Sequence, residues 1–229
     1  MRRDQRPLAS VPAWLWGLLG ASLAAQIALH AALGPVRRAG VDLPPAPSAQ
    51  ALRLASLGEA PAGARLAMLY LQGFDIRALD YGRLVAWLRA ALALDPRSQY
   101  PLFAAARVYA EHPDPARSRR MLEFVHEHYL LDPERRWPWL AHAALIAKHR
   151  LKDLPLARQY AADIDRHTRA ADVPLWARQM EIFILEDMNE LEAAKIMLGG
   201  LLASGKVRDP AEARFLKERL DALEARGRR

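Results

Sequence analysis

The segments "YPLFA" (100–104), "WPWLA" (137–141) and "VPLWA" (173–177) decide the fold, because they are three copies of one pattern. Each has an apolar residue before a proline and a bulky residue directly before an alanine. The same proline–alanine pair occurs at 61–64 and 210–213, so the spacings between successive prolines are 40, 37, 36 and 36 residues. Proline suits the first turn of a helix, where an N–H group has no partner to lose. A fixed period in this range predicts a stack of similar helical units.

A second helical pattern lies between each pair of prolines. It covers residues 81–94, 115–131, 155–169 and 190–204, and a last pattern at 210–225 is left without a partner. Each unit is thus a helix–turn–helix hairpin, and one hairpin cannot bury its own apolar face. Continuous runs of Val, Ile and Thr, which favour strands, are missing. The sequence predicts an all-α fold: an α-solenoid of about four repeats of 36–40 residues, closed by a C-terminal capping helix.

The ends of two units carry the most specific family signal. In "ALALDP" (91–96) and "EHYLLDP" (127–133), Asp-Pro stops a helix and opens the following turn. The segment "LFAAARVY" (102–109) places small residues where a neighbouring helix would pack. These segments resemble the tetratricopeptide-repeat family over about residues 60–226. The resemblance implies a right-handed superhelix whose concave face binds peptides or other proteins. A related helical-hairpin solenoid would show the same pattern.

The side chains around the repeated prolines should form a ladder along one side of the solenoid. They act either as packing between units, which aromatic periodicity favours, or as the lining of a groove that binds an apolar partner segment. Val173 belongs to the same register. The candidates for a protein-binding groove are Tyr100, Phe103, Arg107, Trp137, Leu140, Trp176, Met180 and Phe183.

The N-terminal region predicts a membrane anchor. Residues 8–35 contain no charged side chain, and a membrane-spanning helix needs about 20 apolar residues. Trp14 and Trp16 lie near its start, where aromatic rings favour the headgroup level. We therefore expect a transmembrane helix at 11–35. A cleaved signal peptide with "SLA" (22–24) at its cleavage site is the alternative, although the apolar run is longer than a signal peptide needs.

The predicted helix divides the rest of the chain into four segments. A short basic cytoplasmic segment (1–10) precedes the helix, a Pro-rich linker (36–50) follows it, and a basic tail (227–229) ends the chain after the solenoid domain (51–226). The expected location is a bacterial inner membrane, crossed once, with the C-terminal domain in the periplasm. Ser22, Gln26 and His30 share one face of the helix and are candidates for helix association, or are merely tolerated there.

Several function classes lack their sequence signals. Cysteine is absent, and the seven histidines have no spacing typical of metal ligands, so we expect no metal and no cofactor. No phosphate-binding glycine loop or catalytic motif occurs, so we do not expect an enzyme. The net charge of +7 divides into +4 in residues 1–38, +3 in 225–229 and zero between them. A neutral body lacks the basic face that nucleic acid requires.

The sequence therefore predicts a membrane-anchored scaffold for protein–protein interaction, such as an assembly or accessory factor for a bacterial inner-membrane or envelope complex. Its partners would be another protein and the lipid bilayer, the latter through residues 11–35. The alternative is a constitutive structural subunit of a larger membrane complex, bound through its transmembrane helix.

Overall fold

The computed structural model describes residues 12–33, 42–169, 173–205, 207 and 209–227. These residues form eleven α-helices and one short 3-10 helix, and none of them lies in a strand. The first helix of each hairpin, here called an A helix, is α3 (Ala60–Leu71), α5 (Tyr100–Arg107, continued by η2, Tyr109–Glu111), α7 (Pro133–His149) or α9 (Leu175–Asp187). The second, or B helix, is α4 (Tyr81–Leu94), α6 (Pro115–Tyr129), α8 (Leu154–His167) or α10 (Leu191–Ala203). The remaining helices are α1 (Ala13–Leu33), α2 (Ala49–Ala55) and α11 (Pro210–Gly227).

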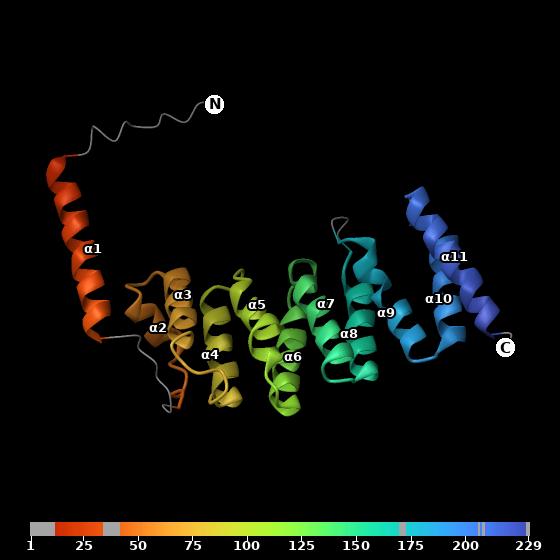
Figure 1. The fold of residues 1–229 in the computed structure, drawn as a ribbon, viewed down its shortest axis with the longest axis horizontal. Helices are drawn as coiled ribbons and strands as arrows, with labels where there is room; N and C mark the ends of the chain where they lie inside the picture. The colour runs from red at the N-terminus through yellow and green to blue at the C-terminus, as the bar shows by residue number, and fades with distance from the viewer. Residues whose placement is uncertain (1–11, 34–41, 170–172, 206, 208, 228–229) are drawn as a thin grey trace.

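The helices from α2 to α11 follow one another along a single axis (Figure 1). Within each hairpin the A helix packs on its B helix, and α7 and α9 both pack on α8. Like helices also meet across units, since α5 contacts α7 and α4 contacts α6. The all-helical arrangement is compatible with an α-solenoid. The helices expected at 81–94, 115–131, 155–169 and 190–204 correspond to the four B helices.

Small residues allow this close stacking. Ala105 and Ala106 of α5, and Ala143 and Ala144 of α7, are completely buried between neighbouring helices. Polar side chains add bonds from one unit to the next. The Tyr129 hydroxyl, for example, donates to the Asp163 carbonyl of α8 at 2.9 Å. Contacts between neighbouring units thus follow the repeat of the sequence.

The apolar core has two parts. The larger one extends from Leu43 to Ile184 and the smaller one joins α9, α10 and α11. Helix α9 serves both, because Ile184 belongs to the first part while Ile182 and Leu185 belong to the second. Helices α10 and α11 are therefore attached to the rest of the stack through α9.

Helix α7 begins earlier than the sequence indicates. The repeat pattern places Pro138 in the first turn, but α7 begins at Pro133 and Pro138 lies inside the helix. Pro133 directly follows Asp132, and proline at the first helical position loses no hydrogen bond. Trp137 and Trp139 consequently lie one turn into α7 rather than at its start.

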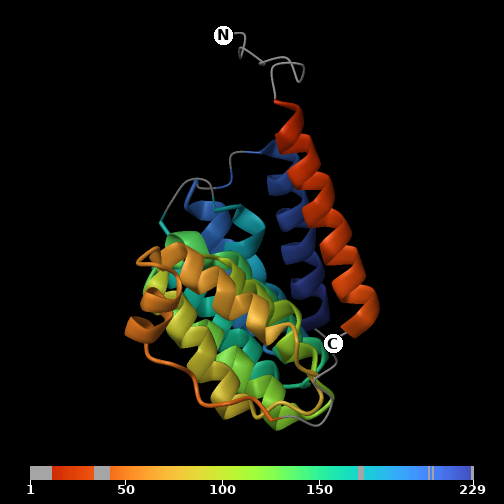
Figure 2. The same ribbon diagram turned by 90° about the vertical axis from the view of Figure 1, so that its left-hand side faces the viewer.

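Part of the Pro-rich linker packs on the helical stack. The described part of the Pro-rich linker, residues 42–48, packs against α4. Leu43 is completely buried. The Trp87 indole N–H donates to the Pro44 carbonyl at 2.9 Å, and Arg83 donates to the Leu43 carbonyl at 2.7 Å. Seen along the axis of the stack, this segment runs beside the first helices (Figure 2).

The structure contradicts the expected membrane anchor. In the part of the chain that the structure describes, no helix is both long enough and apolar enough to cross a membrane. Alanine and glycine make up much of α1, and Ser22 and Gln26 interrupt its apolar surface. The predictions of a transmembrane helix at 11–35 and of a single-pass inner-membrane location are therefore wrong. Ser22 and Gln26 are exposed, whereas residues 1–11 and 34–41 and the side chain of His30 lie outside the described part.

Candidate functional site

The A helices carry a row of aromatic side chains that touch from one unit to the next. Tyr100 and Phe103 of α5 stack with ring centroids 6.0 Å apart. Phe103 meets the edge of Trp139 of α7 at 5.6 Å, and Trp137 of α7 meets Trp176 of α9 at the same centroid distance. We call these five residues the A-helix face. The row crosses three consecutive units.

This face is open to solvent although its members contact one another. The exposed fractions are 43% for Tyr100, 37% for Phe103 and 51% for Trp176. Trp137 and Trp139 are half-buried. Aromatic rings of this size contribute strongly to binding when a partner covers them. The exposed rings are therefore available for contact with another molecule.

Hydrogen bonds hold two of the rings in place. The Gln72 side-chain amide, directly after α3, donates to the Tyr100 hydroxyl at 2.8 Å. The Trp139 indole N–H donates to the Gln99 side-chain oxygen at 2.6 Å. Both bonds join neighbouring units, so the positions of the rings depend on the stacking of the hairpins. The face is formed before any partner binds.

The structure separates the predicted groove residues into two groups. Leu140 is completely buried and Met180 is 8% exposed, so both act in packing between helices. Val173, from the same register, is also buried. Phe183 is half-buried beneath the Arg219 guanidinium, which lies 4.8 Å from its ring centroid. The exposed group consists of Tyr100, Phe103, Arg107 and Trp176, to which Trp137 adds a half-buried ring.

Trp139 is the member of the face that the sequence register missed. The register aligned Phe103 with Leu140, but in the structure Phe103 contacts Trp139, and α7 begins at Pro133. The Leu-Asp-Pro turn at 131–133 was the signal for this start, since Pro133 fits a first helical turn as well as Pro138 does.

A basic pair lies beside the aromatic row. The Arg107 Nη1 lies 3.3 Å from the Nδ1 of His142 on α7, and the His142 Nε2 is buried with no hydrogen-bond partner among the described residues. Burial lowers the pKa of His142, the charge of Arg107 lowers it further, and Glu111 raises it. Within the described chain, no carboxylate oxygen lies within ion-pair distance of either Arg107 or His142. The Arg107 guanidinium therefore places a positive charge at the edge of the A-helix face.

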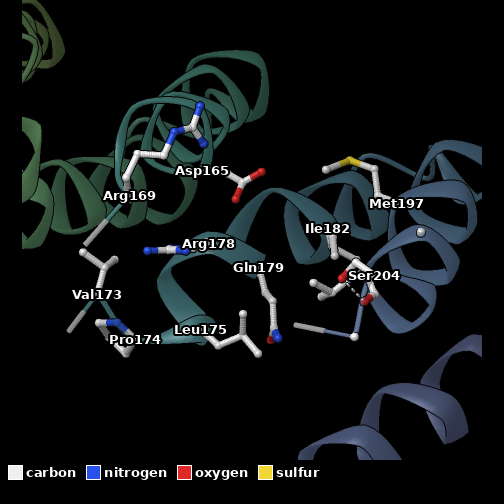
Figure 3. Close-up of a pocket in the computed structure, with 13 residues that line it drawn as sticks. Asp165, Arg169, Val173, Pro174, Leu175, Arg178, Gln179, Ile182, Met197 and Ser204 are labelled. Carbon is white, nitrogen blue, oxygen red and sulfur yellow. Dashed lines mark hydrogen bonds between the residues drawn. The ribbon is translucent and has the colours of Figure 1, made fainter. Parts of the chain in front are cut away.

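A cavity lies between the end of α8, the start of α9 and α10 (Figure 3). Its volume is about 860 Å³. Asp165, Arg169 and Arg178 bring charges of both signs to its wall, beside apolar Ile182 and Met197. The described chain holds no group of three acidic or histidine side chains suited to a metal.

No family model, no curated protein sequence and no solved structure matches the chain. The class that the structure defines is an all-helical protein compatible with a helical-repeat fold. The candidate site is the set of aromatic side chains on the A helices.

Proposed function

We propose that this protein is a tetratricopeptide-like repeat protein that binds a segment of another protein along the A-helix face. It would serve as an interaction scaffold, in the manner of an accessory or assembly factor. The single observation that carries the proposal is the set of exposed rings on the A helices, Tyr100, Phe103 and Trp176, with the half-buried Trp139 against Phe103 and the half-buried Trp137 against Trp176. The resemblance of the 91–96 and 127–133 segments to the tetratricopeptide-repeat family supports it.

Physical reasons favour this surface for binding. Aromatic residues dominate the energetics of protein interfaces when a partner removes them from water. The bonds from Gln72 to Tyr100 and from Trp139 to Gln99 fix the rings beforehand. A surface fixed in this way loses little side-chain entropy on binding. An extended partner segment would bury several rings at once.

A constitutive subunit role through α1 is the second candidate. Every α1 residue whose exposure is described is exposed, including Trp14, Leu18 and Leu23. A helix whose surface is mostly apolar is normally buried against another element. In this second role α1, and not the A-helix face, would hold the partner.

The test is affinity purification of the tagged full chain from the cells that express it, with mass spectrometry of the proteins that co-purify. We expect the double substitution Phe103→Ser with Trp176→Ser to lower recovery of the specific partner at least tenfold, because both exposed rings leave the contact. Ile196→Ser on α10 is the matched control, since Ile196 is a 75% exposed apolar residue of a B helix. Equal recovery with all three proteins contradicts the proposal. Loss only after removal of residues 1–36 favours the second candidate.

A further inference from the structure

We propose that the bound protein segment carries an aspartate or glutamate next to its apolar residues, and that Arg107 and His142 bind this carboxylate. The inference rests on the proposed function, because it specifies the partner of the same A-helix face. The two basic side chains come from neighbouring A helices, α5 and α7, and lie 3.3 Å apart. The carboxylate would span both units.

The position of Arg107 joins the anion site to the aromatic row. Arg107 follows Phe103 by four residues on α5, and side chains four residues apart share one face of a helix. Both are exposed. A segment that covers Phe103 with an apolar side chain would therefore bring a neighbouring side chain to Arg107.

The other basic side chains that cross between helices show what is missing at this pair. Five of them end on carboxylates: Arg89 on Glu127, Arg119 on Asp153, Lys148 on Asp187, Arg158 on Glu181 and Arg219 on Glu186. Arg136 ends on backbone carbonyl oxygens instead. Arg107 instead ends on an imidazole, which cannot neutralise a guanidinium. Charge-assisted hydrogen bonds to a carboxylate are about twice as strong as those between neutral groups. A carboxylate at this pair would give Arg107 the kind of partner that these five basic side chains have.

Protonation of His142 should accompany this binding. The charged groups that face His142 are Arg107, which lowers its pKa, and Glu111, which raises it; burial lowers the pKa most. A bound carboxylate favours the charged imidazole and raises that pKa. Binding therefore takes up a proton, and affinity should increase as the pH falls. The carboxylate of the partner stays ionised above about pH 5.

The experiment selects random 12-residue peptides displayed on phage for binding to the full chain at pH 6.5. The expected consensus has an acidic residue beside Phe, Trp or Leu. The best peptide and its analogue with Gln in place of the acidic residue are then compared by fluorescence anisotropy. Arg107→Gln should weaken the acidic peptide about tenfold and leave the Gln analogue nearly unchanged, because the two changes remove the same interaction. His142→Gln should remove the pH dependence of binding, and Arg89→Gln, from a B helix, is the control that changes neither.

The outcomes separate the two proposals. If the selected peptides lack an acidic residue, or if the Gln analogue binds as tightly as the acidic peptide, the carboxylate inference is overturned while the A-helix face stands as a binding surface. If no peptide is selected, or if the peptides bind the Phe103→Ser protein unchanged, the proposed function fails as well.

Discussion

One aspartate decides where α4 begins. The Asp80 Oδ1 accepts hydrogen bonds from the backbone N–H groups of Gly82 at 2.7 Å and Arg83 at 3.1 Å. These two bonds lower the pKa of Asp80 below its ordinary value, and the bond from Arg83 has the larger effect. Asp114 and Asp153 cap α6 and α8 in the same way. At the residue scale, aspartate caps thus start three of the four B helices.

Replacement of Asp80 by alanine is expected to lower the free energy of unfolding by about 1 kcal/mol at pH 7, the usual contribution of an N-cap. Because the folded-state pKa lies below the unfolded value, this contribution is complete above the unfolded pKa and is lost as the pH falls through the folded pKa. Urea denaturation at pH 7 and pH 3 measures both effects. Asp80→Asn keeps a side-chain oxygen that can cap the helix, so only the pH dependence of the unfolding free energy should be lost. An Asp80→Ala protein as stable as wild type at pH 7 would contradict the capping role.

The glycines of α10 and α3 should respond in opposite directions to alanine. A Cβ added at Gly199 or Gly200 meets no atom within 4 Å, so each substitution should stabilise α10 by about 0.5–1 kcal/mol through helix propensity. A Cβ at Gly63 would lie 2.9 Å from the Ser56 Oγ and 3.1 Å from the Leu52 carbonyl, so Gly63→Ala should destabilise the protein. Thermal denaturation of the three variants tests this contrast, which a loss of stability in Gly199→Ala would refute.

At the element scale, α7 shows how far the sequence determines the site. The proline period correctly placed a helix there, but two prolines compete for its start. In the structure α7 begins at Pro133, Leu140 lies in the core and Trp139 contacts Phe103. Which proline begins a helix depends on how the hairpins pack, and that packing is not encoded in local sequence. The ladder was therefore predictable as a row, and its individual members were not.

Because Pro138 lies inside α7, it cannot donate the backbone hydrogen bond of that position. Pro138→Ala should consequently raise the free energy of unfolding by about 1 kcal/mol, less than the full interior penalty because proline also restricts the unfolded chain. Chemical denaturation measures this change. If α7 began at Pro138, the same substitution would be neutral or destabilising.

At the scale of the whole molecule, contacts connect each unit mainly to its neighbours. The larger core ends at α9, and the smaller core of α9, α10 and α11 is built on residues such as Leu198 and Leu216. Stacked repeats of this kind unfold in parts, since each interface contributes separately to stability. The sequence predicted this order of helices from its period. The Arg107–His142 pair was not predictable, because it joins residues 35 apart whose meeting depends on the stack.

Truncation in the smaller core should loosen only one end of the stack. Leu216→Ala removes a completely buried side chain and should cost about 2–5 kcal/mol. We expect faster amide hydrogen exchange in α10 and α11, while α4 to α8 keep their protection. Leu122→Ala, a completely buried leucine of α6, is the matched control and should loosen the central units. Equal loss of protection along the whole chain in Leu216→Ala would show that the stack unfolds as one unit.

The most direct test of the A-helix face is photo-crosslinking in the cells that express the full chain. A photoreactive phenylalanine analogue replaces Phe103, Ile196 on α10 or Leu23 on α1, one position at a time, and mass spectrometry identifies the adducts. The predicted result is one specific protein partner attached at position 103 and absent at 196. Attachment of the partner only at position 23 would contradict the central claim and assign recognition to α1.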